Sequence, residues 1–281
     1  MTVLCRPTRL LATACVAVLA TAAWAAGPAV PGEHTVAIEG MEMHYRVAGA
    51  GEPLLLLHSG TQSGEMFEPF VPELSQSYRL IIPDLRGHGG STNPDGVWDT
   101  RQFARDVYAL LDHLGVERFR AVGASAGGMT LLHMALQQPQ RVQAMVVVGV
   151  GTSLPASCRD TLAKVDADML PEAAWARLRA RHVHGDAQIR ALYAWVASLA
   201  QGPEDMRFAV EQLAAINAPT LIIHGDRDYC FPASMAWDIY SALPEAYLWV
   251  VPNGGHVPIG GAQAQQFSTA VRAFLAGEWA S

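Results

Sequence analysis

One serine stands between two glycines in the run AVGASAGGMT, residues 121–130. The apolar residues before it are typical of a strand, and those after it are typical of a helix. In a strand–Gly-x-Ser-x-Gly–helix turn the serine adopts a strained backbone conformation, while the glycines let strand and helix approach closely. The hydroxyl of Ser125 would then project above the sheet, beside the positive end of a helix that begins at Ala126. Such a serine is suited to nucleophilic attack in acyl transfer.

A mostly parallel sheet is the element that must position this serine. Short apolar runs bounded by turn residues recur along the chain, and helical patterns separate several of them. This alternation predicts an α/β fold whose sheet is covered on both faces. Two earlier runs, residues 35–38 and 43–47, predict an antiparallel hairpin at the sheet edge. The expected strands are residues 54–59, 78–85, 118–125, 144–150, 219–226 and 246–253, and the expected helices include residues 101–114, 126–138 and 263–275.

The alternation stops between residues 152 and 216. This stretch contains helical patterns, such as residues 171–181, and no strand pattern. An insertion after the strand ending at Val150 would lie over the carboxyl ends of the strands, where open parallel sheets bind ligands. We therefore expect a core of residues 26–151 and 217–281 with a helical lid of residues 152–216.

Aromatic side chains of the expected lid are candidates for lining a substrate pocket. Trp175, Trp195 and Phe208 lie in this stretch. Aromatic residues at helical spacing also serve as packing residues, so both interpretations stay open.

Two other motifs are spaced in part like metal or nucleotide sites. His182, His184 and Asp186 are spaced like metal ligands, but they lie between predicted helices and lack the further ligands that such a site needs. The run at residues 149–151 follows a strand like a dinucleotide-binding loop, but Leu154 stands where the third glycine belongs. We therefore expect no metal and no cofactor.

Length and charge limit the classes of protein. A chain of 281 residues with 51% hydrophobic residues can bury a sizeable core. Its net charge is −7, Lys164 is its only lysine, and its arginines are scattered. A nucleic-acid partner is not expected, because phosphate neutralisation needs clustered positive charge. The composition does not predict an oligomeric state.

The N-terminal residues have the pattern of an export signal. Two arginines precede an uncharged run at residues 10–23, and Ala23 and Ala25 are small residues at the positions that a signal peptidase reads. We expect a signal peptide of residues 1–25, cleaved after Ala25, and a secreted or periplasmic protein without stable membrane insertion. An uncleaved anchor is the alternative, because no charge appears again until Glu33.

Two cysteines, Cys158 and Cys230, remain after this cleavage. In an oxidising compartment they can form a disulfide, but two cysteines can equally be buried or free. Neither interpretation is favoured by spacing.

Four further segments carry a resemblance to a known family. His58-Ser59-Gly60 follows a strand, DLRGHGGS occupies residues 84–91, HGDRDYCFP occupies residues 224–232, and NGGH occupies residues 253–256. With the serine turn, they resemble the motifs of the α/β-hydrolase family, in the family's order, from about residue 34 to the C-terminal helix. The resemblance implies an eight-stranded, mostly parallel sheet flanked by helices, with an inserted helical lid. Ser59 departs from the pattern, because the family usually has glycine there.

The resemblance also implies catalytic roles. Ser125 would be the nucleophile, His256 the base that accepts its proton, and Asp228 the acid that holds the imidazole in one tautomer. Asp226 is a rival for the acid, but the family's pattern favours the second aspartate. Some members take the acid from the loop after the sixth strand, and residues 149–157 contain no carboxylate.

Two backbone N–H groups, those of Gly60 and Ala126, are the expected oxyanion hole. Structural roles are expected for four polar residues near this site, His58, Asp84, Arg86 and His88.

The nucleophile narrows the reaction. Epoxide hydrolases and haloalkane dehalogenases of this family use a carboxylate at the position of Ser125, so the resemblance implies instead a serine hydrolase that cleaves a carboxylic ester or lactone through an acyl-enzyme. Hydrolysis of thioesters, amides or C–C bonds, lyase or cofactor-free peroxidase activity, and a non-catalytic ligand-binding protein stay open. The lid composition indicates a small-molecule substrate with a moderately apolar acyl or alcohol group.

Overall fold

The computed structural model describes residues 30–202 and 206–279 of the 281-residue chain. The expected signal peptide, residues 1–25, lies outside these residues. Within the described part, no helix combines the length and the hydrophobicity needed to span a membrane.

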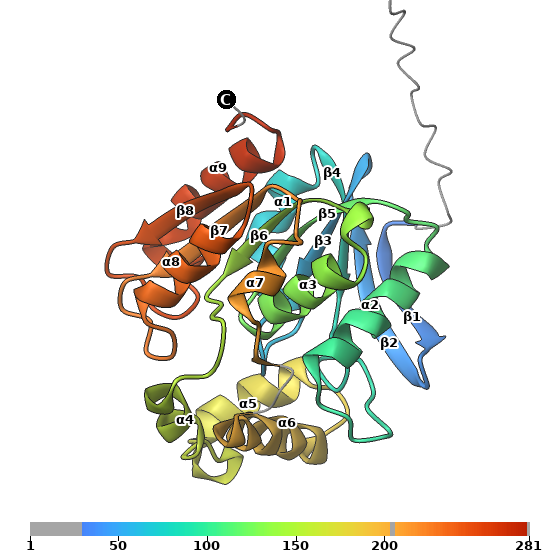
Figure 1. The fold of residues 1–281 in the computed structure, drawn as a ribbon. Helices are drawn as coiled ribbons and strands as arrows, with labels where there is room; N and C mark the ends of the chain where they lie inside the picture. Colours follow the sequence, from blue (N-terminus) through green and yellow to red (C-terminus); the bar gives the residue numbers. More distant parts are fainter. Residues whose placement is uncertain (1–29, 203–205, 280–281) are drawn as a thin grey trace, which may run out of the picture.

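An eight-stranded sheet forms the centre of the molecule, in the order β1-β2-β4-β3-β5-β6-β7-β8 (Figure 1). The hairpin of β1 and β2 forms one edge and pairs antiparallel with β4, whereas all other neighbours are parallel. The α/β class and the eight-stranded sheet are therefore confirmed. The strands are β1 (Gly32–Ile38), β2 (Met41–Ala48), β3 (Glu52–Leu57), β4 (Tyr78–Pro83), β5 (Phe119–Ala124), β6 (Val142–Val148), β7 (Thr220–Gly225) and β8 (Ala246–Val251).

The central strands are apolar along their length because both of their faces are covered. In β3, Leu54 and Leu56 pack into the core on one face, while Leu55 and Leu57 pack into the core on the other. Figure 1 shows α2, α3 and α8 over one face and α1 and α9 over the other. These helices are α1 (Val71–Leu74), α2 (Thr100–His113), α3 (Ala126–Gln137), α8 (Ala233–Ala242) and α9 (Ala264–Leu275); short 3₁₀ turns are η1 (Gly64–Phe70), η2 (Pro139–Arg141) and η6 (Gly261–Gln263).

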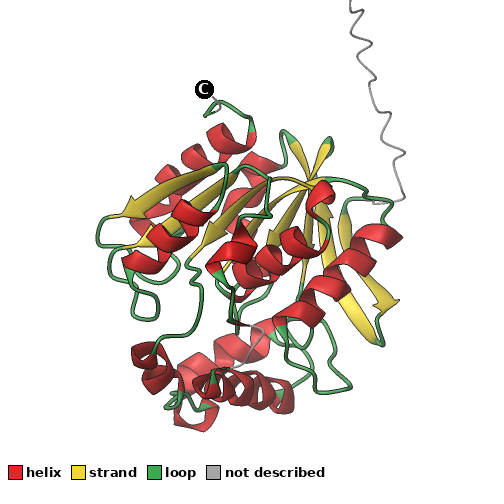
Figure 2. Cartoon of the chain, in the orientation of Figure 1, coloured by secondary structure: helices red, strands yellow, loops and turns green. Residues whose placement is uncertain are grey.

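Residues 152–216, here called the inserted segment, connect β6 to β7. Their described part contains helices and turns and no strand. Figures 1 and 2 show α4, α5 and α6 as a separate helical layer below the sheet, whereas α7 lies against α8. The elements are α4 (Ala156–Leu162), η3 (Ala167–Met169), α5 (Glu172–Arg181), α6 (Asp186–Ser198), η4 (Leu199–Gln201) and α7 (Val210–Leu213).

Candidate active site

Ser125 lies in a strained turn between β5 and α3. Its backbone has φ 49° and ψ −114°, in a region that non-glycine residues rarely adopt. Its N–H donates to the carbonyl oxygen of Val148, 2.8 Å away, which holds the turn against β6. A Cβ at Gly123 would lie 2.6 Å from the carbonyl oxygen of Gly127. A Cβ at Gly127 would overlap the carbonyl oxygen of Leu57. Both glycines are therefore required by the close approach of α3 to the sheet.

Three side chains from distant parts of the chain meet at this turn. His256, in the loop after β8, has its Nε2 atom 2.8 Å from the Oγ atom of Ser125. Its Nδ1 atom lies 2.9 Å from Oδ2 and 3.0 Å from Oδ1 of Asp228, in the loop after β7. The three form one continuous hydrogen-bonded series from hydroxyl to imidazole to carboxylate.

The Asp228 carboxylate is fully buried. Burial by itself raises the pKa of a carboxyl group, but the hydrogen bond from His256 and the backbone N–H groups of Cys230 and Phe231 hold the pKa of Asp228 below its ordinary value. An ionised Asp228 accepts a hydrogen bond from Nδ1–H of His256, so Nε2 has a free lone pair toward Ser125. Asp226 is exposed, and its carboxylate pairs with Arg227 at 3.9 Å.

The loops that carry the acid and the base pack tightly on each other. The N–H of Arg227 donates to the carbonyl oxygen of Gly254 over 2.8 Å. A Cβ at Gly225 would overlap the carbonyl oxygen of Gly255. This close backbone packing holds Asp228 opposite His256.

Two residues whose backbone N–H groups are the expected oxyanion hole, Gly60 and Ala126, line the same cavity as Ser125. Ala126 is the first residue of α3, so its N–H has no partner within the helix. Gly60 lies in the loop after β3, and a Cβ built on it would be 3.9 Å from the Cβ of Ala126 and 3.3 Å from the Trp195 ring. Gly60, Ala126, Ser125 and His256 all line one cavity. We call residues 58–63 the oxyanion loop.

This cavity has a volume of about 470 Å³. Its walls come from the core loops and from the inserted segment, and none of the described residues that line it is Asp, Glu, Lys or Arg. The apolar wall from the inserted segment includes Leu154, Leu162, Val165, Val196, Leu199 and Met206.

Of the three aromatic residues predicted to line the pocket, only Trp195 lies at this cavity. Trp175 packs in a small cluster inside the inserted segment, with the Arg179 guanidinium 5.1 Å from its ring centre. Phe208 packs against the ring of His133 in a tilted arrangement, with centroids 4.5 Å apart. The prediction is corrected for Trp175 and Phe208, because their rings stabilise the packing of the insertion rather than a substrate surface.

Two aromatic residues at the site were missed from the sequence. The rings of Tyr229 and Phe231 lie 5.3 and 5.6 Å from the ring of His256, and both line the cavity. They follow Asp228 by one and three residues in the sequence. This nearness to the expected acid is the sequence feature that indicates a place at the site.

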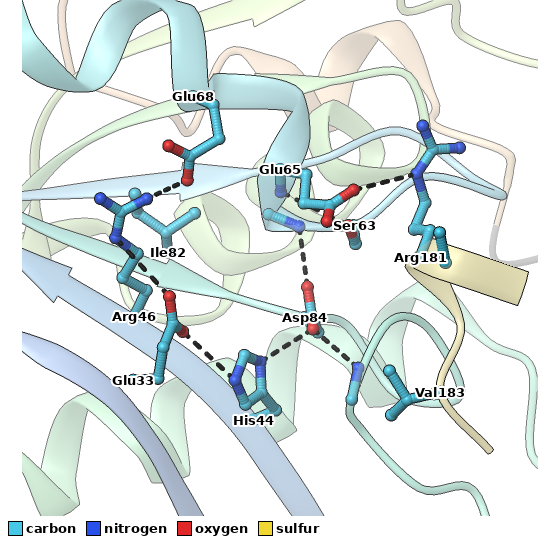
Figure 3. A pocket seen from close by; sticks show the side chains of 13 residues that line it. Glu33, His44, Arg46, Ser63, Glu65, Glu68, Ile82, Asp84, Arg181 and Val183 are labelled. Atoms are coloured by element: carbon cyan, nitrogen blue, oxygen red, sulfur yellow. Dashed lines mark hydrogen bonds and ion pairs between the residues drawn. The ribbon is translucent and has the colours of Figure 1, made fainter. Parts of the chain in front are cut away.

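A buried carboxylate, that of Asp84, connects the start of η1 to the loop after β4. Asp84 accepts hydrogen bonds from the N–H groups of Gly64 and Gly90 at 2.7 and 2.8 Å, and its carboxylate lies 2.9 Å from His44 (Figure 3). Although burial raises the pKa of a carboxyl group, these bonds and His44 lower that of Asp84. The surrounding cavity has a volume of about 220 Å³. Figure 3 shows charged side chains of its lining in ion pairs, such as Arg181 with Glu65.

The two histidines that are spaced like metal ligands, His182 and His184, contact backbone groups of the core. His182 accepts the N–H of Gly89 at Nδ1 over 2.9 Å, and the Nε2 atom of His184 lies 2.9 Å from the carbonyl oxygen of Gly90. Among residues 30–202 and 206–279, no group of three or more His, Cys, Asp or Glu side chains is arranged to hold a metal ion.

Cys158 and Cys230 form a disulfide across 72 residues of sequence. Cys158 belongs to α4 and Cys230 lies two residues after Asp228, whose carboxylate accepts its N–H over 2.7 Å. The bridge therefore ties the inserted segment to the loop that carries the acid.

Replacing both cysteines, Cys158→Ser with Cys230→Ser, is expected to lower the free energy of unfolding by about 4 kcal/mol, because the bridge closes a long loop. Urea unfolding of the two proteins measures this difference. A reductant should shift the midpoint of the natural protein toward that of the double variant and leave the variant unchanged. Equal midpoints for both oxidised proteins would contradict a stabilising bridge.

Sequence comparisons place this geometry among known proteins. A family model described as the α/β hydrolase fold matches residues 52–183. A pimeloyl-[acyl-carrier protein] methyl ester esterase from Nitrosomonas europaea is 29% identical over 77% of this chain and 93% of its own length. A 2-hydroxy-6-oxo-6-(2'-aminophenyl)hexa-2,4-dienoic acid hydrolase from Metapseudomonas resinovorans is 25% identical over 80% of this chain and 84% of its own. A soluble epoxide hydrolase from Corynebacterium sp. (strain C12) is 36% identical, but the match covers only 41% of this chain and 40% of that protein.

A comparison with solved structures finds the same fold. The crystal structure of a hydrolase from Pseudomonas aeruginosa PA01 superposes with a TM-score of 0.72 and 28% identity, covering 86% of this chain and 98% of the other. The matched family model, the hydrolase relatives and the shared architecture lead to one assignment. The chain belongs to the α/β-hydrolase fold family.

Proposed function

We propose that this protein is a serine hydrolase that cleaves an uncharged carboxylic ester or lactone through an acyl-enzyme. Ser125 is the nucleophile, His256 the general base and acid, and Asp228 the residue that orients the imidazole. The observation that carries this proposal is the series of hydrogen bonds, 2.8 Å from Ser125 to His256 and 2.9 Å from His256 to Asp228.

The geometry supports a two-step reaction. Nε2 of His256 takes the hydroxyl proton as Oγ of Ser125 forms a bond to the substrate carbonyl carbon. The N–H groups of Gly60 and Ala126 stabilise the resulting oxyanion, and losing one such donor typically costs about 3 kcal/mol of transition-state stabilisation. His256 then gives its proton to the departing alkoxide, leaving the acyl group on Ser125. A water molecule deprotonated by His256 then attacks the acyl carbon, and His256 returns the proton to Oγ of Ser125 as the bond to the acyl group breaks and the carboxylic acid is released.

The cavity favours an uncharged substrate. Its described lining contains no charged Asp, Glu, Lys or Arg side chain. A substrate carboxylate in this cavity would lose hydration without gaining a cationic partner, which costs several kcal/mol.

The uncharged lining of the cavity favours one of the reactions for which the relatives are named over another. The Nitrosomonas europaea relative is named an esterase, which agrees with an uncharged ester. The Metapseudomonas resinovorans relative is named for a dienoic acid, whose carboxylate has no counterpart charge in the present cavity. The Corynebacterium relative is named an epoxide hydrolase. By the family resemblance that reaction would need a carboxylate at position 125, where this chain has serine.

We also propose that residues 1–25 direct export and are removed after Ala25. The Cys158–Cys230 bridge supports this, since disulfides persist in oxidising compartments. N-terminal sequencing of the exported protein tests the cleavage site.

A panel of p-nitrophenyl esters tests the function and the charge preference together. Each uncharged acyl chain is paired with a chain of the same length that ends in a carboxylate. We expect the uncharged member to have a kcat/KM about 100-fold higher, because the cavity leaves the carboxylate unpaired. A fluorophosphonate probe should label Ser125, as mapped by peptide mass spectrometry.

Two results would count against this function, and a third would count against its charge preference alone. Absence of both labelling and ester turnover would leave a ligand-binding protein. Turnover of a 2-hydroxy-6-oxo-dienoic acid without ester turnover would favour C–C hydrolysis. Equal rates for charged and uncharged esters would refute the preference but keep the hydrolase.

A further inference from the structure

His182 joins the inserted segment to the oxyanion loop. It lies directly after α5, where its own N–H donates to the carbonyl oxygen of Leu178, and its side chain is buried. Nδ1 of its ring accepts the N–H of Gly89 over 2.9 Å, and Nε2 lies 3.1 Å from the carbonyl oxygen of Thr61. One side chain of the insertion thus touches two separate loops of the core.

The protonation of this ring follows from its contacts. Burial lowers the pKa of His182 to about 4, so the ring is neutral near neutral pH. Because Nδ1 accepts a hydrogen bond from Gly89, the single ring proton lies on Nε2. Nε2–H is therefore the donor to the carbonyl oxygen of Thr61.

This hydrogen bond continues through two peptide units to Gly60. The Thr61 carbonyl shares a peptide unit with the N–H of Gln62, and that N–H donates to the carbonyl oxygen of Ser59 over 3.2 Å. The Ser59 carbonyl in turn shares a peptide unit with the N–H of Gly60. No cis peptide occurs in the described residues, so C=O and N–H point in opposite directions in each unit. Fixing the Thr61 carbonyl therefore helps to fix the direction of the Gly60 N–H.

The loop needs such support because its backbone is unusual. Thr61 has φ 59°, a left-handed conformation that a β-branched residue rarely adopts. On the core side, Nδ1–H of His58 donates to the carbonyl oxygen of Ser59 over 2.8 Å. On the side of the inserted segment, His182 holds the carbonyl of Thr61. The strained turn is held from both sides.

The neighbours of His182 make a different set of contacts. The hydrogen bonds of Val183, His184 and Gln188 to the core go to carbonyl oxygens of residues 87–90. They dock the insertion without touching the oxyanion loop. His184 is therefore a suitable control for His182, because both histidines lie between α5 and α6 and bind the core loop that contains Gly89 and Gly90.

We propose that His182 is a positioning residue for hydrolysis, which directs the Gly60 N–H toward the oxyanion through Thr61 and Ser59. This inference rests on the proposed function. It means that the oxyanion hole is complete only when the inserted segment is docked on the core. Loss of His182 should therefore weaken transition-state binding more than substrate binding.

The test compares His182→Phe with His184→Phe in ester hydrolysis. The first variant keeps a ring but loses both hydrogen bonds, and we expect kcat to fall about 10- to 100-fold with KM within about twofold, because a misdirected donor acts only in the transition state. The inhibition constant of n-butylboronic acid, which forms a tetrahedral adduct with the serine, should rise by a similar factor. His184→Phe should change each quantity by less than about twofold.

Two further variants separate positioning from folding. His182→Gln offers an amide acceptor and an N–H donor, and it should restore most of kcat and of the boronic acid affinity. His182→Asn keeps an acceptor for Gly89 but is too short to reach Thr61, so it should behave like His182→Phe. Thermal unfolding of all variants shows whether the fold is retained.

The inference is overturned if His182→Phe and His182→Asn bind the boronic acid as tightly as His184→Phe does. It is equally overturned if kcat follows only the loss of thermal stability. A natural protein that neither hydrolyses esters nor binds the boronic acid refutes the proposed function, and this inference with it. An active natural protein with unaltered His182 variants refutes this inference alone.

Discussion

Ser125→Ala is expected to lower kcat for ester hydrolysis by about 10⁶-fold, the scale typical for removing a serine nucleophile. The Oγ atom is the group that would form the acyl-enzyme, and its hydrogen bond goes to His256. Serine and alanine tolerate the φ of 49° at position 125 equally, so the turn and the fold should persist in the variant. Steady-state kinetics with the best p-nitrophenyl ester, together with fluorophosphonate labelling, measures the loss.

Ser157→Ala is the matched control for this substitution. Ser157 is an exposed serine of α4 and does not line the cavity. Its removal should leave kcat within about twofold. If Ser125→Ala kept activity within tenfold of the natural protein, or if the probe labelled another residue, then Ser125 would not be the nucleophile.

The core strands were predictable because their signal is local. A run such as Leu54–Leu57 is apolar at every position, as expected for a strand covered on both faces, and its short length between turn residues favours a strand over a helix. The same logic fails for α8, for which no prediction was made. Of its ten residues only Ala236 and Ile239 are buried, so its apolar face is too narrow to produce a clear helical period.

The meeting of Ser125, Asp228 and His256 also follows from local features, once the strands are parallel. Each residue comes shortly after the carboxyl end of a strand, β5, β7 or β8. Neighbouring parallel strands end at one edge of the sheet, so these loops must gather there. The order of motifs is thus sufficient to bring the side chains together without knowledge of any long-range contact.

The pocket depends on contacts that leave no such pattern. Trp175 and Trp195 both lie on helices of the inserted segment and both are buried. One faces the small core of the insertion, and the other faces the cavity. Helical periodicity identifies a buried face but not the element that buries it.

Three other residues also make contacts between distant elements that no local sequence pattern reveals. Cys158 and Cys230 lie in separate elements, and their pairing depends on how α4 docks beside the acid loop. The spacing of His182 to His184 in the sequence is that of metal ligands and does not indicate a contact with the core. Its contact with Thr61 spans 121 residues of sequence and arises only in the folded chain.

Asp228→Asn is expected to lower kcat/KM by about 10⁴-fold while the fold is retained. In the natural protein Oδ1 of Asp228 accepts the N–H groups of Cys230 and Phe231. An asparagine would keep its amide oxygen on these two donors and would therefore turn its NH₂ group toward Nδ1 of His256. The ring must then carry its proton on Nε2, the atom 2.8 Å from Ser125 Oγ, and can no longer accept the hydroxyl proton.

Asp226→Asn isolates the electrostatic part of this effect. It removes the same charge two residues away, from an exposed carboxylate that pairs with Arg227. We expect kcat/KM to change by less than about threefold, because an exposed charge is screened by solvent. If Asp226→Asn were the more damaging substitution, the acid would be Asp226. If both variants lost activity equally, the negative charge of the loop would matter rather than the tautomer of His256. Only a large loss in Asp228→Asn beside a near-natural Asp226→Asn agrees with a carboxylate that acts by fixing the ring proton on Nδ1.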